Sequence, residues 1–523
     1  MESCMEPLLI TGESLKVDDV VAVANGRRVE LSPDVLPQIK RSRRAVETLV
    51  NEKRVAYGIT TGFGHFKDKI IPPEEVKQLQ LNLVRSHAVG VGPALSREAA
   101  RAMLLVRANT LAKGFSGVRP VVITTMLDIL NADIYPRILS QGSLGASGDL
   151  APLAHLGMVL LGEGEVFVDG EAVLAADVFA KHGIQPLELQ AKEGLAILNG
   201  TTMMVGLGAL LVRRGINLLI TADIAACLSL EALKGTDRAY DHRVHAVRPH
   251  PRQADCAAFL RKLLEGSQFL RDDDPLNVQD PYTLRCVPQV HGAVRDAVAY
   301  AQWVIDIELN AVNDNPIIFT EEGSDEFDVI SAGNFHGEPI AFAADYMKLA
   351  LTDLGNMSER RIARLVDADC NQSVLPMFLT EYGGLQSGFM IAQYTAASLA
   401  SENKSLAHPA SADSIPSSAN TEDHVSMGAI AVRNLEKVLN HVEHIVSIEL
   451  MAAAQGIDFR RKRMGRPDAA LGAGTSAAYA CLREAVPFVD EDVYFAPLMQ
   501  KVKDLVESAE IKLRVEQTLE GAD

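Results

Sequence analysis

The chain has 523 residues, of which 48% are hydrophobic, so it is long enough and apolar enough to bury a large core. Its formal net charge of −18 would repel a phosphate backbone, which disfavours nucleic acid as a partner. The first residues lack the basic and apolar regions of a secretory signal, and no apolar run approaches the roughly 18 residues that a membrane span needs. These properties predict a globular, cytoplasmic protein without a membrane segment.

Most long segments carry the spacing of apolar residues that is typical of helices. In chain order, these segments cover roughly residues 97–131, 207–233, 292–312, 342–365, 386–406 and 429–456. Strand patterns are short. Residues 165–173 predict a hairpin closed by Asp169-Gly170, and residues 316–319 are expected to pair with residues 328–330 across an acidic loop. The pattern indicates a mainly α protein with an elongated helical bundle.

The distribution of glycine suggests how the chain is organised. A mixed, glycine-rich part gives way to long helices near residue 197, and there is no tandem repeat or flexible linker. We therefore expect an all-α fold with an N-terminal active-site domain over residues 1–196 and a long-helix bundle domain over residues 197–523.

Metal and disulfide sites have little support in the sequence. The six cysteines are scattered without C-x-x-C spacing, which favours reduced thiols. His242, His245 and His250 lie close together, but no cysteine or carboxylate stands at a matching ligand spacing. We expect ordinary hydrogen-bonded or surface histidines there, and no metal.

The stretch "QGSLGASGDLAP" (141–152) concentrates small residues around Ser147. A nucleophilic serine of the G-x-S-x-G type would need a glycine where Asp149 stands, so a hydrolase has weak support. In another chemistry, the Gly148 nitrogen attacks the Ala146 carbonyl carbon, and loss of two waters gives a five-membered ring with an exocyclic methylidene derived from Ser147. Small residues permit the bend that this cyclisation needs. By spacing alone, a plain Gly/Ser loop is the commoner interpretation.

Further motifs run in order along the chain. "GSLGASGDLAPLAH" (142–155) closely resembles the active-site signature of the aromatic amino acid ammonia-lyases, which carry a methylidene-imidazolone (MIO) group. Other blocks similar to that family are "YGITTGFG" (57–64), "NLVRSHAVGVG" (82–92), "LAILNGT" (195–201), "QDPYTLRCVPQVHG" (279–292), "ELNAVNDNP" (308–316), "GNFHGEP" (333–339), "SGFMIAQ" (387–393), "ASENKSLAHPAS" (400–411) and "EDHVSMG" (422–428). The resemblance covers nearly the whole chain from about residue 20 onward. It implies an all-α fold, a homotetramer, active sites shared between subunits, and an MIO formed from Ala146-Ser147-Gly148 with no external cofactor.

The same resemblance implies roles for individual residues. Tyr57 would remove the β-proton of the amino acid substrate, and Arg285 would clamp the substrate carboxylate, because its planar guanidinium matches two oxygens. The resemblance also places Asn199 near the amine, Gln279 and Tyr282 along the site, and Phe335 against the electrophile.

The residues that would meet the substrate side chain resemble those of the histidine-acting members. Ser86-His87 and Glu402 of "ASENK" match that pattern. A neutral imidazole offers one donor and one acceptor, which a carboxylate and a second histidine can satisfy. A purely apolar ring would leave the carboxylate unpaired, at a cost of several kcal/mol. The expected reaction is therefore elimination of ammonia from L-histidine to give trans-urocanate.

Some positions leave alternatives open. Thr202 and Val89 depart from the histidine-acting pattern, so a phenylalanine or tyrosine ammonia-lyase, forming cinnamate or coumarate, is an alternative. An aminomutase would carry the same prosthetic group. A helical scaffold without activity is disfavoured by the intact Ser147. Asp149 and His155 are expected to be local hydrogen-bond supports.

Overall fold

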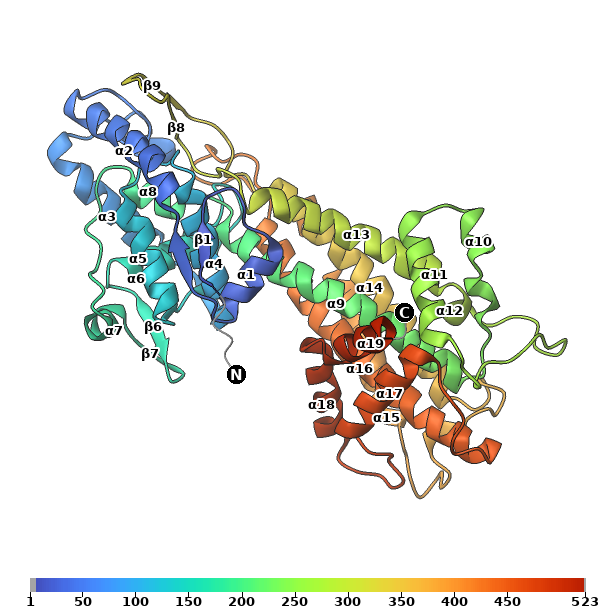
Figure 1. The fold of residues 1–523 in the computed structure, drawn as a ribbon. Coiled ribbons are helices and arrows are strands. Elements are labelled where there is room, and N and C mark those ends of the chain that lie inside the picture. The colour runs from blue at the N-terminus through green and yellow to red at the C-terminus, as the bar shows by residue number, and fades with distance from the viewer. Residues whose placement is uncertain (1–5, 522–523) are drawn as a thin grey trace. The chain divides into compact units, whose positions relative to one another are not determined.

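The computed structural model describes residues 6–521, and the chain is mainly helical (Figure 1). This confirms the predicted all-α fold class. Contacts divide the chain into two compact units. Unit 1 comprises Met1–Arg213, Ala301–Asp345 and Pro409–Arg433, and unit 2 comprises Arg214–Tyr300, Tyr346–His408 and Asn434–Asp523. The units do not follow the predicted linear division at residue 196/197, because two later segments return to the unit that holds the Ala146-Ser147-Gly148 loop.

Unit 1 is built around a helix whose residues are buried from Ala99 to Ala112. Its helices are α1 (Val17–Ala24), α2 (Leu36–Asn51), α3 (Val76–His87), α4 (Arg97–Ala112), α5 (Pro120–Asn131), α6 (Leu150–Leu160), α7 (Ala175–His182) and α8 (Glu193–Leu198). The single helical stripe expected over residues 97–131 is two helices. The second begins at Pro120, which suits a first helical turn because that position needs no amide hydrogen.

The strands described by the structure are short and belong to unit 1. They are β1 (Leu8–Ile10), β2 (Val29–Leu31), β3 (Val91–Ala94), β4 (Tyr135–Pro136), β5 (Leu139–Gln141), β6 (Glu165–Val168), β7 (Glu171–Leu174), β8 (Ile317–Thr320) and β9 (Phe327–Ile330). β1 and β2 pair in parallel, β3 pairs with β5, and β6 lies between β4 and β7. Both predicted hairpins are confirmed. β6 and β7 join at Asp169-Gly170, which both have positive φ as a two-residue turn requires, and β8 pairs with β9.

Unit 2 consists of helices in the described residues. Those confined to it are α10 (His242–Ala246), α11 (Pro251–Leu264), α12 (Tyr282–Arg285), α15 (Met390–Leu406), α17 (Ala473–Ala485), α18 (Phe495–Glu507) and α19 (Glu510–Glu520). Long helices contribute residues to both units, namely α9 (Thr202–Ala232), α13 (Val287–Glu308), α14 (Glu338–Val366) and α16 (Gly428–Met464). Within unit 2, the buried Arg361 of α14 donates two hydrogen bonds to the buried Glu449 of α16, at 2.5 and 2.9 Å. This charge pair fixes the two helices against each other.

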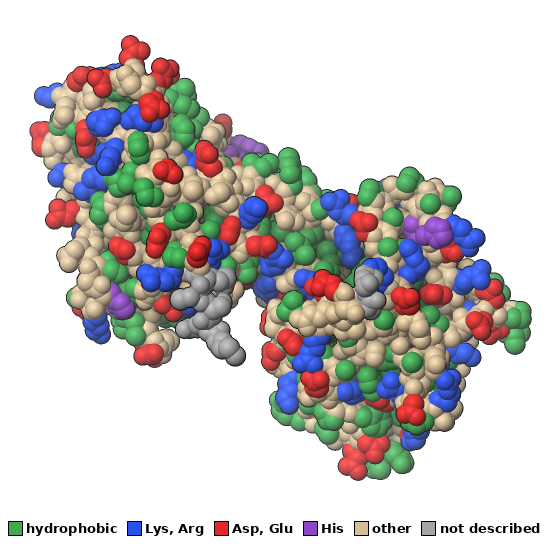
Figure 2. Space-filling view, in the orientation of Figure 1, with side chains coloured by type: hydrophobic (Ala, Val, Ile, Leu, Met, Phe, Trp, Pro, Cys, Tyr) green, Lys and Arg blue, Asp and Glu red, His purple; other side chains and the backbone are tan. Residues whose placement is uncertain are grey.

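Short 3-10 helices occupy some of the connections. They span Pro33–Val35, Gly64–Phe66, Pro73–Glu75, Asp237–Tyr240, Met377–Leu379 and Ala410–Ala412. The face of each unit shown in Figure 2 carries acidic and basic side chains interspersed, although the net charge is negative. Such a mixed surface is typical of a globular protein.

Helix α9 corrects one expectation. By length and composition it is apolar enough to cross a membrane, because an 18-residue window within it has a mean hydropathy of 1.6. The expectation that no apolar segment approaches the length of a span is therefore wrong for this helix. Of that window, 67% is buried inside the protein, which is the property of a core helix.

Candidate active site

The loop between β5 and α6 holds the Ala146-Ser147-Gly148 triplet against a second segment of backbone. Gly148 has a φ of +72°, and a Cβ at this position would lie 2.1 Å from the Gly200 carbonyl oxygen. The next residue, Asp149, donates its amide hydrogen to that same oxygen at 2.8 Å. Only glycine fits at position 148, because the two backbones touch there.

Asp149 anchors the loop from inside the protein. Its carboxylate accepts hydrogen bonds from Ser143 Oγ at 3.1 Å and from the Met204 amide, in the first turn of α9, at 3.0 Å. Burial raises the pKa of Asp149 to about 7, although the hydrogen bonds from Met204 and Ser143 oppose the shift. On the other side of the loop, His155 Nε2 accepts the Gly90 amide hydrogen at 3.1 Å. Both residues make local hydrogen bonds of the kind expected from the sequence.

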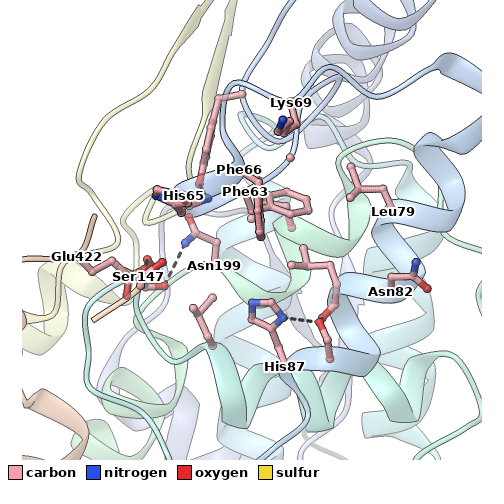
Figure 3. Close-up of a pocket in the computed structure, with 18 of the residues that line it drawn as sticks. Phe63, His65, Phe66, Lys69, Leu79, Asn82, His87, Ser147, Asn199 and Glu422 are labelled. Carbon is pink, nitrogen blue, oxygen red and sulfur yellow. Dashed lines mark hydrogen bonds between the residues drawn. The ribbon is translucent and has the colours of Figure 1, made fainter. Parts of the chain in front are cut away.

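Ser147 is half-buried and makes two hydrogen bonds to distant parts of unit 1. Its hydroxyl donates to Glu422 Oε1 at 2.7 Å, and its carbonyl accepts from Asn199 Nδ2 at 3.1 Å, the second of which is drawn in Figure 3. The other oxygen of Glu422 accepts from Ser417 Oγ at 3.0 Å. Asn199 Oδ1 is buried and has no hydrogen-bond partner among the described residues. This amide therefore has an acceptor to spare beside the triplet.

A cavity of about 950 Å³ opens over Ser147 (Figure 3). Tyr57, Phe63, His87, Asn199 and Glu422 are among its lining residues. The Tyr57 hydroxyl oxygen accepts the Gly64 amide hydrogen at 3.2 Å, and the rings of Tyr57 and Phe63 meet edge to face at 6.5 Å. These contacts hold the phenol at the wall of the cavity.

His87 is the last residue of α3 and lines the same cavity. Its Nδ1 is 3.0 Å from Ser86 Oγ, as the dashed line in Figure 3 marks. Burial lowers the pKa of His87, while the Leu83 backbone and the Glu422 carboxylate oppose the shift. His87 is therefore neutral near pH 7, with one ring nitrogen as a donor and the other as an acceptor.

The structure places the other predicted residues elsewhere. Gln279, Tyr282 and Arg285 line a cavity of about 520 Å³ in unit 2, where Arg285 Nε donates to the Asp280 carbonyl at 2.9 Å and its guanidinium carbon lies 4.5 Å from the centre of the Tyr282 ring. Phe335 is half-buried in the turn that precedes α14 in unit 1. The cavity over Ser147 is thus lined by Tyr57, His87, Ser147 and Asn199 among others. Its lining does not include the other predicted residues, which are Gln279, Tyr282, Arg285 and Phe335.

Glu422 is the carboxylate that lines this cavity together with His87, and it is not among the site residues predicted from the sequence. Glu402, the predicted residue, is exposed on α15 in unit 2 and does not line the cavity over Ser147. The block "EDHVSMG" contained the necessary signal, since it begins with Glu422. Of the two glutamates in family-like blocks, Glu422 lines this cavity within one chain.

Comparisons with known proteins agree over nearly the full length of the chain. The family model "Aromatic amino acid lyase" matches residues 15–484. The chain is 55% identical over 508 residues to the histidine ammonia-lyase of Chloroflexus aurantiacus, covering 96% of this chain and 97% of that protein. Among solved structures, it is similar to the tyrosine aminomutase of Streptomyces globisporus, with a TM-score of 0.92 and 38% identity over 98% of this chain and 99% of that one. It is also similar to the histidine ammonia-lyase of Trypanosoma cruzi, with a TM-score of 0.89 and 38% identity over 98% and 96% of the two chains.

Proposed function

The chain belongs to the aromatic amino acid lyase family and is a carbon–nitrogen lyase, and from this premise we propose that it eliminates ammonia from L-histidine to give trans-urocanate. The observation that carries the proposal is the presence of His87 and Glu422 in one cavity with Ser147. A neutral imidazole donates one hydrogen bond and accepts another, so a carboxylate and a second imidazole can satisfy both of its nitrogens.

The same pair disfavours an apolar substrate. A phenyl ring in this cavity would desolvate Glu422 without giving its carboxylate a hydrogen-bond donor, which costs several kcal/mol for a buried charge. We propose that Glu422 takes part in substrate recognition, because it lines the cavity with His87. Glu402, like Arg285, lies outside the lining of this cavity and would be supplied by a neighbouring subunit.

We further propose that Ala146-Ser147-Gly148 cyclises to MIO without an external cofactor, and the residues fit this group. The backbone of Gly148 lies against Gly200 in the bent conformation that the loop needs, and therefore no Cβ can be accommodated at Gly148. Asn199 donates to the Ser147 carbonyl and keeps a buried acceptor free beside it. When formed, the group supplies an electrophile that turns the amine of the substrate into a leaving group.

The residues of the chain would perform the proton transfer and hold the substrate. Tyr57 would accept the β-proton as the double bond forms and ammonia departs, since its hydroxyl is held at the cavity wall. Arg285 would clamp the substrate carboxylate, with Gln279 and Tyr282 beside it, because a planar guanidinium binds two oxygens at once. Phe335 would pack against the reacting group.

Tyr57 and Arg285 line different cavities of one chain. We therefore propose a cytoplasmic homotetramer, as the family resemblance implies, in which each active site is completed by residues of neighbouring subunits. Its partner besides further copies of itself would be the amino acid substrate, with no role for nucleic acid or membrane.

An aminomutase is the second candidate, because the tyrosine aminomutase structure resembles the whole chain. A phenylalanine or tyrosine lyase is the other alternative, which rests on the departures from the histidine-acting pattern at Thr202 and Val89. Thr202 is buried at the start of α9, where its hydroxyl oxygen accepts a hydrogen bond from Arg107 at 3.4 Å, and it is absent from the lining of the cavity over Ser147. Val89 is exposed and lines a smaller cavity, of about 240 Å³, together with His87 and Ser147.

The test is a parallel assay of the purified protein with L-histidine, L-phenylalanine and L-tyrosine. Ultraviolet absorbance follows the conjugated acid, ammonia is measured separately, and mass spectrometry detects any β-amino acid. We expect urocanate, with a kcat/KM for L-histidine at least about a hundredfold above the others, because the cavity would leave polar groups unpaired around a phenyl ring. Cinnamate, coumarate or a β-amino acid as the main product would refute the histidine assignment. The intact mass should show the loss of two waters from the chain.

A further inference from the structure

A set of metal-ligating side chains lies in unit 1 outside the lining of the cavity over Ser147. It consists of His336, Glu338 and His424, which we call the His-Glu-His cluster. Glu338 is the first residue of α14, His336 lies two residues before it, and His424 lies in the segment that precedes α16. We propose that this cluster binds a divalent transition-metal ion of the zinc class.

The distances in the cluster suit a metal better than hydrogen bonds. Glu338 Oε2 is 3.9 Å from His336 Nδ1 and 3.8 Å from His424 Nε2. Both separations are too long for a direct hydrogen bond. Ligand atoms bound tetrahedrally to zinc at about 2.0–2.1 Å lie about 3.3 Å apart, so each of these two pairs needs to close by only about half an ångström. All three ligand atoms lie within 4.8 Å of one another. The imidazole rings of His336 and His424 are already parallel to within 3°, with centres 5.7 Å apart.

One atom of the cluster lacks a partner. Glu338 Oε2 is buried, and no described residue forms a hydrogen bond with it. A buried carboxylate oxygen without a donor or a cation carries a large desolvation cost. His336 Nδ1 accepts only a long hydrogen bond of 3.3 Å from the Glu338 amide, so little is lost if its lone pair binds a metal instead. A cation between the three side chains would remove the unpaired carboxylate oxygen.

The donor set indicates the class of metal. Two imidazoles and one carboxylate are ligands that suit zinc and its neighbours, and three protein ligands leave a fourth position for water. The His424 side chain is 68% exposed, whereas those of His336 and Glu338 are 29% and 23% exposed. Solvent therefore has access from the side of His424, where an ion would enter and a water would complete its coordination.

The cluster is tied to the loop that holds Ser147. Gly337, between two of the ligands, donates its amide hydrogen to the Gly145 carbonyl at 3.2 Å. Ser426, two residues after His424, donates its hydroxyl hydrogen to the same carbonyl at 3.0 Å. A metal would clamp together the two segments that support Gly145, so its role is to position the loop and Glu422 rather than to contact the substrate.

A second group of potential ligands, Asp223, Cys256 and His291 in unit 2, is a useful contrast. Asp223 already accepts hydrogen bonds from His291 Nδ1 at 2.6 Å and from Arg295 Nη2 at 2.5 Å. A metal there would have to displace or oppose the Arg295 guanidinium. We therefore treat this group as a closed charge network and use it as an internal control.

Zinc binding by the full-length protein tests the proposal. The enzyme is stripped with a chelator, and Zn²⁺ uptake is measured by equilibrium dialysis with elemental analysis. The visible spectrum of added Co²⁺ reports the coordination. We expect one ion per chain in the wild type, and at least about tenfold weaker binding in Glu338→Gln and in His424→Ala, because each loses a ligand. Cys256→Ala, in the control group, and His182→Ala, an exposed histidine of α7, should bind as the wild type does.

Three results would overturn the proposal. They are the absence of stoichiometric Zn²⁺ binding to the wild type, binding that neither Glu338→Gln nor His424→Ala weakens, and binding that Cys256→Ala abolishes. Because the His424 side chain is mostly exposed, its truncation should not disturb folding, and circular dichroism of the metal-free variants checks this. Binding that is lost only in the two cluster variants supports the site independently of any effect on turnover.

Discussion

The Ser147 hydroxyl donates a hydrogen bond of 2.7 Å to Glu422 Oε1, although 275 residues separate them in the chain. Ser417 occupies the other carboxylate oxygen, so the orientation of Glu422 is fixed at the edge of the cavity. If Ser147 loses its hydroxyl as water when the proposed prosthetic group forms, Glu422 Oε1 loses its donor. That oxygen then becomes an acceptor to which a substrate imidazole can donate.

Replacing Glu422 should therefore damage recognition of histidine. A hydrogen bond to a charged group is worth about 1.5–3 kcal/mol, so we expect Glu422→Gln to lower kcat/KM for L-histidine by about 10- to 100-fold. Glu171→Gln is the matched control, because that side chain is exposed on β7 and does not line the cavity over Ser147. Steady-state kinetics of both variants and of Glu402→Gln make the comparison, and a loss confined to Glu402→Gln would assign recognition to the residue predicted from sequence.

Gly148→Ala should prevent the loop from forming, because the added Cβ would meet the Gly200 carbonyl oxygen at 2.1 Å. The matched control is Gly183→Ala, at the end of α7, where φ is +70° rather than +72° and no atom lies within 4 Å. The control is destabilised only by its left-handed backbone conformation, by about 1–2 kcal/mol. We expect Gly148→Ala to lower the melting temperature clearly more and to retain both waters in the intact mass. Equal destabilisation by the two substitutions would contradict the steric argument.

The protonation state of His87 predicts the pH range in which activity is lost on acidification. Its pKa is lowered by burial, so the folded protein protonates it only below the ordinary value of about 6.5. Protonation would remove the acceptor that an imidazole substrate needs. The part of the acid limb of kcat/KM that depends on His87 should lie below pH 6.5, and His87→Gln should remove it. A His87-dependent limb above that pH would show that the imidazole is stabilised as a cation.

The raised pKa of Asp149 leads us to expect that the stability of the fold depends on pH. In the unfolded chain its carboxyl ionises near pH 3.9, whereas in the folded protein its pKa is about 7. Between these values the Asp149 carboxyl binds more protons in the folded state than in the unfolded state. Its contribution to the free energy of unfolding is therefore most favourable below about pH 4 and falls as the pH rises towards about 7. Urea unfolding of Asp149→Asn and of the wild type across this range measures the difference. The variant should lack this component of the slope, and identical slopes would place the pKa of Asp149 near its ordinary value.

A shared active site predicts complementation between inactive variants. Ser147→Ala removes the source of the electrophile, and Arg285→Ala removes the proposed carboxylate clamp. If one subunit supplies Ser147 and another supplies Arg285, then co-refolded or co-expressed mixtures should regain up to about a quarter of wild-type activity by random assembly. The single variants alone provide the baseline. Mixed oligomers that remain at that baseline would indicate that each chain completes its own site.

The local parts of the structure were readable in the sequence. The hairpin at Asp169-Gly170 could be predicted because a two-residue turn needs residues that tolerate positive φ. The long helices could be predicted because their apolar spacing persists over many turns. By contrast, the pairing of β1 with β2 joins three-residue segments that are separated by a whole helix, and such segments are too short to carry a periodic signal.

The candidate site divides in the same way. Ser147 and its small neighbours were found because their chemistry is contained in three consecutive residues. Glu422 was missed because its position beside Ser147 depends on the return of residues 409–433 to unit 1, which is a tertiary event. The sequence pattern around Glu422 does not show that contact.

The contact between Gly148 and Gly200 also indicates where directed evolution of a new substrate range can succeed. A Cβ at Gly200 would itself lie 2.4 Å from Asn313 Oδ1 and 2.5 Å from Arg107 Nη1, so neither glycine has room for a side chain. Libraries that vary these two positions would consist largely of inactive clones. Diversity is better spent on the cavity wall, at positions such as Leu79 and Asn82 of α3, where a new side chain changes the shape offered to the substrate and leaves the loop intact (Figure 3).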